Sequence, residues 1–215
     1  MLKNNYNYIL NGISHEIEIK SNIKIQQDPL DEIILISNKF MLKFINDLFD
    51  YNSIEYILLG NCLLGCEIFQ GINIFKNDIE LMTLKNNFVK IKNLKEYLES
   101  NNFNIRFYDN HIEISSKFFK NYNCIVNIFL LENVKKNLIL QKNNIFSFDL
   151  YDIFPIKKKA FEEFELSVPN KINNVLKKYL IDIDKITFKE YKINDYTFDK
   201  IVQIIIIIII LLTNF

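Results

Sequence analysis

The sequence predicts an α/β or α+β fold in which helices flank a mixed β-sheet. Apolar residues make up 49% of the 215-residue chain, which is enough for one packed domain. In the first half, segments with helical spacing alternate with short apolar runs that are typical of strands. In the following part, strand-like segments succeed one another. This order of elements indicates a domain built around a mixed sheet.

The helices are predicted from apolar residues that recur at steps of three and four. The longest of these patterns is clearest from Met41 onward, where Ile45, Leu48 and Phe49 follow on the same face. We expect helices over residues 31–51, 62–69, 87–100 and 171–180.

The strands are predicted from short apolar runs bounded by turn residues. One run ends at Gly60, and the polar residues Asp109 to His111 join two others as a hairpin. Loose alternation within residues 1–30 favours an N-terminal hairpin. We expect further strands over residues 54–59, 79–84, 103–108, 112–115 and 124–131.

The charge balance argues against binding to nucleic acid or to anionic lipid. Lys+Arg and Asp+Glu both number 26, so the formal net charge is zero, and attraction to a phosphate backbone is weak. The 3 cysteines are too few for a disulfide framework. The first twenty residues contain no apolar run of signal-peptide length. We therefore expect a reducing, cytoplasmic environment and no nucleic-acid partner.

The segment with a chemical signal runs from Leu58 to Glu80. A strand that ends at Gly60 and leads into a helix exposes backbone N–H groups, which can hold a phosphate. Asp78 and Glu80 lie two apart on a predicted strand, so both carboxylates project from one face and could hold Mg²⁺. Phosphoryl or nucleotidyl transfer requires these two features together. The alternative is that both carboxylates are ordinary solvated strand residues.

Three blocks of the chain resemble the LicD/fukutin family of the nucleotidyltransferase superfamily, over about residues 40 to 185. The second block, Ile125 to Phe129, is similar to the strand that carries the family's third acidic residue. The third block begins at Ile153-Phe154-Pro155 and ends near Tyr179. The resemblance implies a nucleotidyltransferase-like mixed sheet flanked by helices. In the first block, the matching residues are Gly60, Leu63, Leu64, Gly65, Gly71, Phe75, Asp78, Ile79 and Glu80.

The resemblance also implies a reaction, the Mg²⁺-dependent transfer of a phosphorylated alcohol of the phosphocholine or phosphoribitol type. The donor would be CDP-linked and the acceptor a glycan. Asp78 and Glu80 would be the catalytic carboxylates and would hold the metal, assisted by Asn127 as a neutral ligand. The resemblance further implies that Gly60, Asn61 and Lys157 contact the donor phosphates.

The chain departs from the family pattern at charged positions. Glu80 replaces the second Asp of Asp-x-Asp, and Asn127 replaces the third acidic residue. An asparagine brings no charge and cannot act as a base. Ile68 and Leu180 replace an Arg and a Gly of the family. Because the apolar skeleton remains while site charges are lost, the alternative is a catalytically degraded member that acts as a binding or scaffold module.

Other reactive side chains have simpler interpretations. We expect Cys62 and Cys66 to pack in the core and His111 to lie in a surface turn. Lys157 to Lys159 can equally be a solvated run. Glu113 flanks two inward-facing isoleucines, so it projects from the opposite face. It could replace the carboxylate missing at Asn127 if its strand is adjacent.

The predicted organisation is an N-terminal extension or hairpin over 1–30, the main domain over 31–195 and an apolar tail over 196–215. The tail contains 9 consecutive Ile or Leu residues from Ile204 to Leu212, whereas a membrane helix needs about 20 apolar residues. We therefore do not favour membrane contact by the tail. Deleting residues 201–215 is expected to shift the melting temperature by less than about 2 °C.

Overall fold

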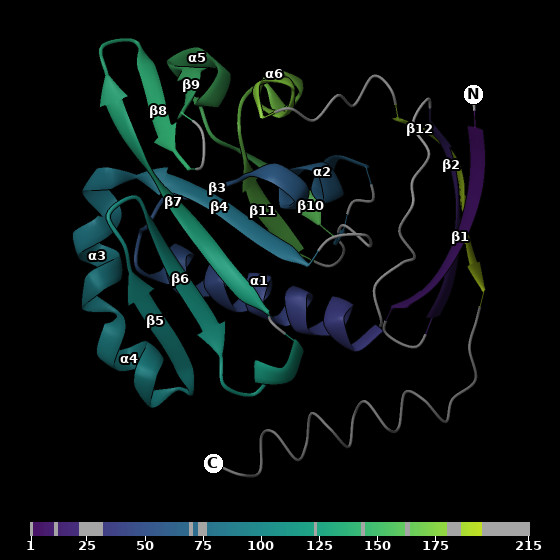
Figure 1. The fold of residues 1–215 in the computed structure, drawn as a ribbon, viewed down its shortest axis with the longest axis horizontal. Helices are drawn as coiled ribbons and strands as arrows, with labels where there is room; N and C mark the ends of the chain where they lie inside the picture. Colours follow the sequence, from purple (N-terminus) through teal and green to yellow (C-terminus); the bar gives the residue numbers. More distant parts are fainter. Residues whose placement is uncertain are drawn as a thin grey trace.

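The computed structural model describes residues 2–10, 13–21, 32–68, 71–72, 77–122, 124–142, 145–161, 164–179 and 186–194. The predicted class is confirmed, because helices pack on a mixed sheet of seven strands (Figure 1). Five of the strands follow the order β3-β4-β7-β6-β5, and β8 pairs with both β7 and β9. The strands are β3 (Ile57–Leu58), β4 (Asp78–Leu84), β5 (Phe103–Phe107), β6 (His111–Ser116), β7 (Ile125–Val134), β8 (Asn137–Gln141) and β9 (Ile145–Asp149).

At the centre of the sheet, β4, which holds the end of the first block, lies beside β7, which begins with the second block, Ile125 to Phe129. β4 and β7 are parallel, with Asp78 opposite Ile125 and Glu80 opposite Asn127. β6 runs antiparallel to β7, and β5 runs antiparallel to β6. Residues paired in register project from the same face of a sheet. The pairing therefore decides which site residues can meet.

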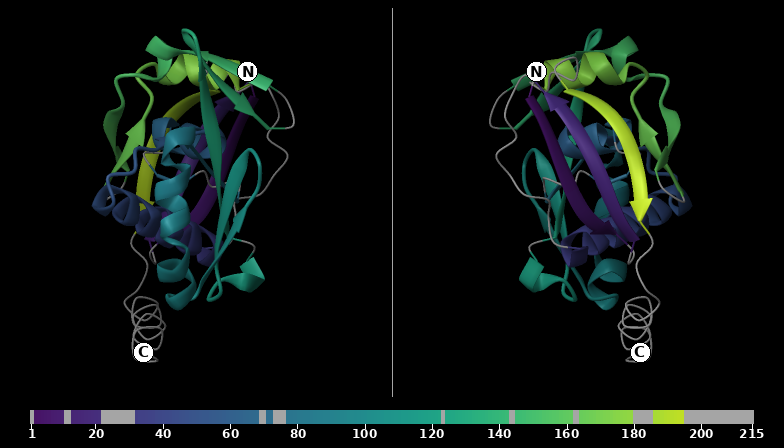
Figure 2. Two further views of the ribbon diagram at one scale, coloured as in Figure 1. Left: turned by 90° about the vertical axis from the view of Figure 1, so that its left-hand side faces the viewer. Right: turned by 90° about the vertical axis from the view of Figure 1, so that its right-hand side faces the viewer.

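Helices cover one face of this sheet. α1, α3 and α4 lie along it, and Figure 2 shows the same layering from the side. Aromatic side chains join the layers: the Phe44 ring stacks on Phe103 at 4.1 Å and the Phe88 ring meets Phe107 at 5.7 Å. The helices are α1 (Glu32–Tyr51), α2 (Gly60–Ile68), α3 (Phe88–Asn93), α4 (Lys95–Ser100), α5 (Leu150–Ile153) and α6 (Ile172–Lys178), with 3₁₀ turns at Lys85–Asn87 and Lys120–Tyr122.

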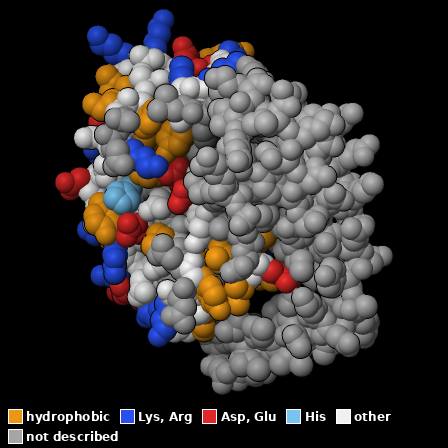
Figure 3. All heavy atoms as spheres, turned by 45° about the vertical axis from the view of Figure 1, so that its right-hand side comes forward, with side chains coloured by type: hydrophobic (Ala, Val, Ile, Leu, Met, Phe, Trp, Pro, Cys, Tyr) orange, Lys and Arg blue, Asp and Glu red, His pale blue; other side chains and the backbone are white. Residues whose placement is uncertain are grey.

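The opposite face carries polar side chains on β6 and β5, whereas on β4 and β7 it carries both polar residues and buried apolar ones such as Met82 and Phe129. In β6, the buried residues Ile112 and Ile114 alternate with the part-exposed residues His111 and Glu113. This alternation is the pattern expected of a sheet with one covered and one open face. In the view of Figure 3, the described surface intersperses acidic and basic side chains with apolar ones.

Two smaller sheets complete the described chain. β10 (Lys157–Phe161) and β11 (Phe164–Val168) form an antiparallel hairpin. Near the N-terminus, β1 (Leu2–Leu10) and β2 (Ile13–Ser21) pair as an antiparallel hairpin. Figure 2 shows β12 (Ile186–Asn194), in yellow, beside β2. The N-terminal hairpin is thus extended by a strand from the other end of the chain.

The structure differs from the sequence-based expectation in several elements. The helix expected over 87–100 is divided at Leu94, whose amide bonds to the carbonyl of Ile91 three residues back. The polar segment after β7 forms the β8–β9 hairpin, in which the buried residues Leu138 and Leu140 alternate with more exposed neighbours. His111 begins β6 and is not part of the turn. Residues 195–215, which include the apolar tail, lie outside the described residues.

No helix within the described residues is long and apolar enough to cross a membrane.

Candidate functional site

Gly60 lies directly against the carboxylate of Glu80. β3 runs antiparallel to β4, and the Leu59 amide donates a hydrogen bond to the Glu80 carbonyl at 2.9 Å. Gly60 then turns into α2 with φ +54°, in the left-handed region that favours glycine. A Cβ at this position would lie 2.0 Å from Glu80 Oε2. The glycine therefore allows the start of α2 to approach the carboxylate.

Asp78 and Glu80 share a face of β4 but have opposite surroundings. Asp78 is exposed, and it accepts a hydrogen bond from Asn61 Nδ2 at 3.4 Å. Glu80 is buried, with a side chain that is 6% exposed. The structure therefore brings Gly60, Asn61, Asp78 and Glu80 together at the end of β3 and the start of α2.

The buried Glu80 carboxylate is bound by two side chains from distant segments. The Lys142 ammonium, just after β8, forms an ion pair and hydrogen bond with Glu80 Oε1. The Tyr179 hydroxyl, just after α6, donates to Glu80 Oε2 at 3.1 Å and accepts from Lys142 Nζ at 2.6 Å. Both carboxylate oxygens of Glu80 are thus hydrogen-bonded, and Glu80, Lys142 and Tyr179 each contact the other two.

Lys142 is held as a cation. Partial burial alone would lower the pKa of its ammonium, but the hydrogen bonds and charges of Glu80 and Tyr179 outweigh burial and raise that pKa above its ordinary value. The Nζ atom also lies over two aromatic rings, 5.2 Å from the centroid of Phe129 and 5.2 Å from that of Tyr179. Burial is the main cause that raises the pKa of the Tyr179 hydroxyl to about 12.

A row of polar residues crosses the open face of the sheet beside this group. Asn127 on β7 lies opposite Glu80, and Glu113 on β6 lies opposite Asn127. Arg106 on β5 is next in the row, opposite Glu113. Glu113 is therefore adjacent to Asn127. A residue that replaces the carboxylate missing at Asn127 would need this position. The Glu113 oxygens instead face the Tyr108 hydroxyl at 3.1 Å and His111 Nε2 at 3.6 Å.

The arrangement does not fit the Mg²⁺ site that the sequence suggests. Magnesium needs oxygen ligands that are free to surround it, usually carboxylates aided by water and phosphate. Glu80 is taken up by an ammonium and a hydroxyl, Asn127 is neutral, and Asp78 alone of the three is an exposed carboxylate. In the described part of the chain, no cluster of three or more His, Cys, Asp or Glu side chains could hold a metal ion.

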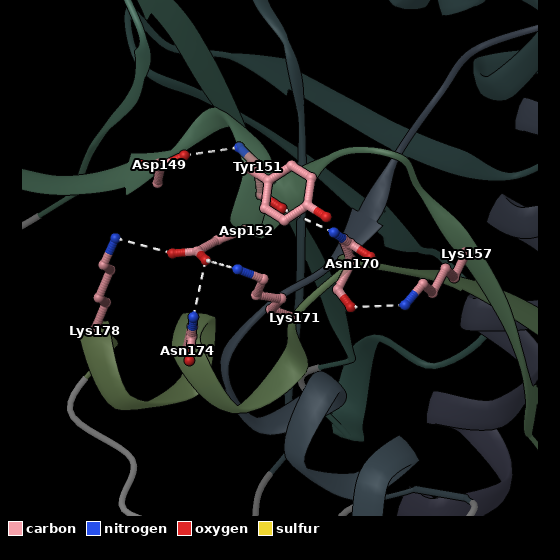
Figure 4. Close-up of polar contacts among 8 residues, drawn as sticks. All are labelled: Asp149, Tyr151, Asp152, Lys157, Asn170, Lys171, Asn174 and Lys178. Atoms are coloured by element: carbon pink, nitrogen blue, oxygen red, sulfur yellow. Dashed lines mark hydrogen bonds and ion pairs between the residues drawn. The ribbon is translucent and has the colours of Figure 1, made fainter.

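Lys157 lies apart from the other predicted site residues. It lies on β10 and donates a hydrogen bond to the Asn170 carbonyl at 3.0 Å (Figure 4). Together with Lys171 it lines a cavity of about 410 Å³ at the start of α6. Tyr179, which contacts Glu80, follows the opposite end of α6, whose 7 residues span about 10 Å. A phosphate at Lys157 would thus not touch Glu80.

The remaining candidates behave as structural residues. All three cysteines are buried free thiols, as expected for Cys62 and Cys66. Burial raises the pKa of the Cys62 and Cys124 thiols to about 12, which disfavours the nucleophilic thiolate. The His111 ring stacks on Tyr108 at 4.4 Å and on Phe129 at 5.7 Å. The histidine is therefore a packed strand residue, which corrects the interpretation as a surface turn.

Sequence reasoning missed Lys142. It stands in a polar segment with no motif, and its role depends on the β8–β9 hairpin, which was not predicted. Tyr179 was singled out as part of a pattern but with no role. A buried acidic residue with no basic neighbour in sequence is a signal that a distant partner must exist, but it does not identify that partner.

No protein-family model matches the chain, and no curated protein matches it as a relative.

Proposed function

We propose that this chain is a binding module of the nucleotidyltransferase type, a catalytically degraded relative of the LicD/fukutin proteins that recognises a phosphorylated small molecule and does not transfer it. The observation that carries the proposal is the engagement of Glu80 by Lys142 and Tyr179. It leaves Asp78 as the open one of the two carboxylates that would hold the metal for transfer.

Other features of the site support ligand binding. Gly60 brings the first turn of α2 against the same carboxylate, and the free N–H groups of a helix start suit a phosphate. Asn61 adds an amide donor next to Asp78. The open face beyond Asn127 offers both a cation and carboxylate oxygens, at Arg106 and Glu113. These are recognition groups, and none of them is a positioned base.

A second candidate function is the transfer reaction itself, from a CDP-linked donor to a glycan with Mg²⁺. The observation that favours it is the register: Asp78, Glu80 and Asn127 come from two adjacent parallel strands and share one face. This is the layout that the resemblance to the LicD/fukutin family implies. For transfer to occur, Glu80 would first have to exchange Lys142 for the metal.

Thermal unfolding with a panel of ligands tests the proposal. CMP, CDP and phosphocholine would be added to the full chain at 10 mM, once with EDTA and once with Mg²⁺. For a ligand with a Kd of about 1 mM, the native state gains about 1.4 kcal/mol, or roughly 3–6 °C in melting temperature. We expect a phosphorylated ligand to stabilise the chain equally in both buffers.

Other outcomes separate the candidates. Stabilisation that needs Mg²⁺, together with release of CMP from a CDP-linked alcohol, would support the transfer reaction over the binding module. No stabilisation by any of the ligands in either buffer would overturn both.

A further inference from the structure

We infer that the Lys142 ammonium takes the place of a divalent cation, bridging the Glu80 carboxylate on one side and a phosphate group of the ligand on the other. The inference rests on the proposed function and names the group that recognises the ligand. It predicts that phosphate recognition at this site needs no metal.

The hydrogen-bonding capacity of Lys142 fits a bridge. An ammonium has three donors, and two of them are used by Glu80 and Tyr179. The third has no hydrogen-bond acceptor among the described side chains, and Nζ lies over the Phe129 ring. Because the side chain of Lys142 is 31% exposed while that of Glu80 is 6% exposed, the ammonium is the part of the pair that solvent and ligands reach.

The position of Lys142 places this donor next to the other candidate ligand contacts. Its Nζ lies over the ring of Phe129, which is two residues from Asn127 on the same face of β7. On the other side, Glu80 Oε2 lies against Gly60 at the start of α2. The Glu80 carboxylate therefore lies between Lys142 and the start of α2, and a ligand phosphate would approach the ammonium from the side away from Glu80.

The chemistry favours a phosphate ester over a neutral ligand. A charge-assisted hydrogen bond from an ammonium to a phosphate oxygen is about twice as strong as a neutral one. Buried Glu80 fixes the ammonium in position, so little conformational entropy is lost when the anion binds. Exposed Asp78 repels an anion, which limits affinity and predicts weak, millimolar binding.

Paired ligands that differ only by a phosphate test this role. Binding of CMP and cytidine, and of phosphocholine and choline, would be measured by calorimetry in EDTA for the wild type and for Lys142→Met. We expect Lys142→Met to weaken the binding of the phosphorylated member about tenfold and to change the binding of its partner less than twofold. Lys85→Met is the matched control, because Lys85 also forms an ion pair with a glutamate, Glu132, but on the surface.

A second variant guards against loss of folding. Lys142→Met leaves a buried carboxylate unpaired, so Lys142→Met combined with Glu80→Gln removes both charges together. This double variant is also expected to lose the preference for phosphorylated ligands.

The possible failures are distinct. If the wild type binds no phosphorylated ligand, the proposed function itself fails. If the wild type prefers CMP over cytidine and both Lys142 variants keep that preference, the binding module stands and the bridging role of Lys142 is wrong.

Discussion

Lys142 and Glu80 stand 62 residues apart in the sequence and meet in an ion pair whose carboxylate side chain is 6% exposed. Lys142 comes directly after β8, and Glu80 lies on β4. The pair ties the β8–β9 hairpin to β4, and Tyr179 adds the end of α6 to the same point. Its contribution to stability and to binding can be measured separately.

Removing Lys142 alone is expected to destabilise the fold more than removing both charges. Lys142→Met leaves Glu80 as an unpaired buried anion, which costs about 2 kcal/mol or more of the free energy of unfolding. The double variant, Lys142→Met with Glu80→Gln, keeps a hydrogen-bond acceptor for Tyr179 and carries no unpaired charge. Urea denaturation of the two variants gives the comparison, and equal stabilities would contradict the burial of the charge that we describe.

Gly60→Ala adds a single methyl group and is expected to lower the free energy of unfolding strongly. The left-handed φ costs about 1 kcal/mol for any side chain, and the Cβ would also lie 2.0 Å from Glu80 Oε2 and 3.0 Å from Tyr179 Cε1. We predict a loss of about 2–3 kcal/mol in the free energy of unfolding. In a Glu80→Ala background the contact with the carboxylate is gone, so the same substitution should cost less. An unchanged cost would mean that the backbone conformation alone requires glycine.

The contacts of Asp152 with α6 are expected to make the stability of the fold depend on pH in the acid range. Burial by itself raises the pKa of this carboxyl, but hydrogen bonds from Asn174 and Lys178 and the charges of Lys178 and Lys171 outweigh it and lower the pKa below its ordinary value (Figure 4). A carboxyl with a lowered pKa stabilises the fold above its unfolded pKa and loses that effect as the pH falls through its folded pKa.

The test is thermal unfolding of Asp152→Asn against the wild type from pH 7 to pH 2. The wild type should be more stable above about pH 4, and the difference should shrink as the pH falls below 4. Asp109→Asn, which removes an exposed carboxylate in the β5–β6 turn, is the matched control. A difference that stays constant down to pH 2 would show that the ion pairs of Asp152 with Lys171 and Lys178 do not carry the effect.

Much of the fold could be predicted because its signals are local. The amphipathic spacing of α1 and the apolar runs of β4 and β7 depend on neighbouring residues only. The alternation of Ile112, Glu113 and Ile114 also predicted which face Glu113 takes. The strand-to-helix change near Gly60 was also predicted, although α2 begins at Gly60, before the helix expected over 62–69.

The decisive part of the site could not be predicted because it depends on long-range pairing. Whether Glu113 neighbours Asn127 is fixed by the order of the strands, which no local pattern encodes. Lys142 lies in a hairpin whose first strand has only two fully buried apolar residues, Leu138 and Leu140, a pattern too short to recognise. The resemblance drew attention to Asp78 and Glu80, but it could not show that a lysine from elsewhere engages one of them.

The most direct test of the account is a titration of the chain with Mn²⁺, followed by the loss of the free-ion signal in electron paramagnetic resonance. The wild type is predicted to bind no Mn²⁺ below about 1 mM, because Lys142 already neutralises Glu80. Asn127→Asp combined with Lys142→Met replaces the ammonium and supplies a third carboxylate, and this variant should bind Mn²⁺ well below about 1 mM. Tight Mn²⁺ binding by the wild type that Asp78→Ala abolishes would contradict the account, since Glu80 would then be a metal ligand despite Lys142.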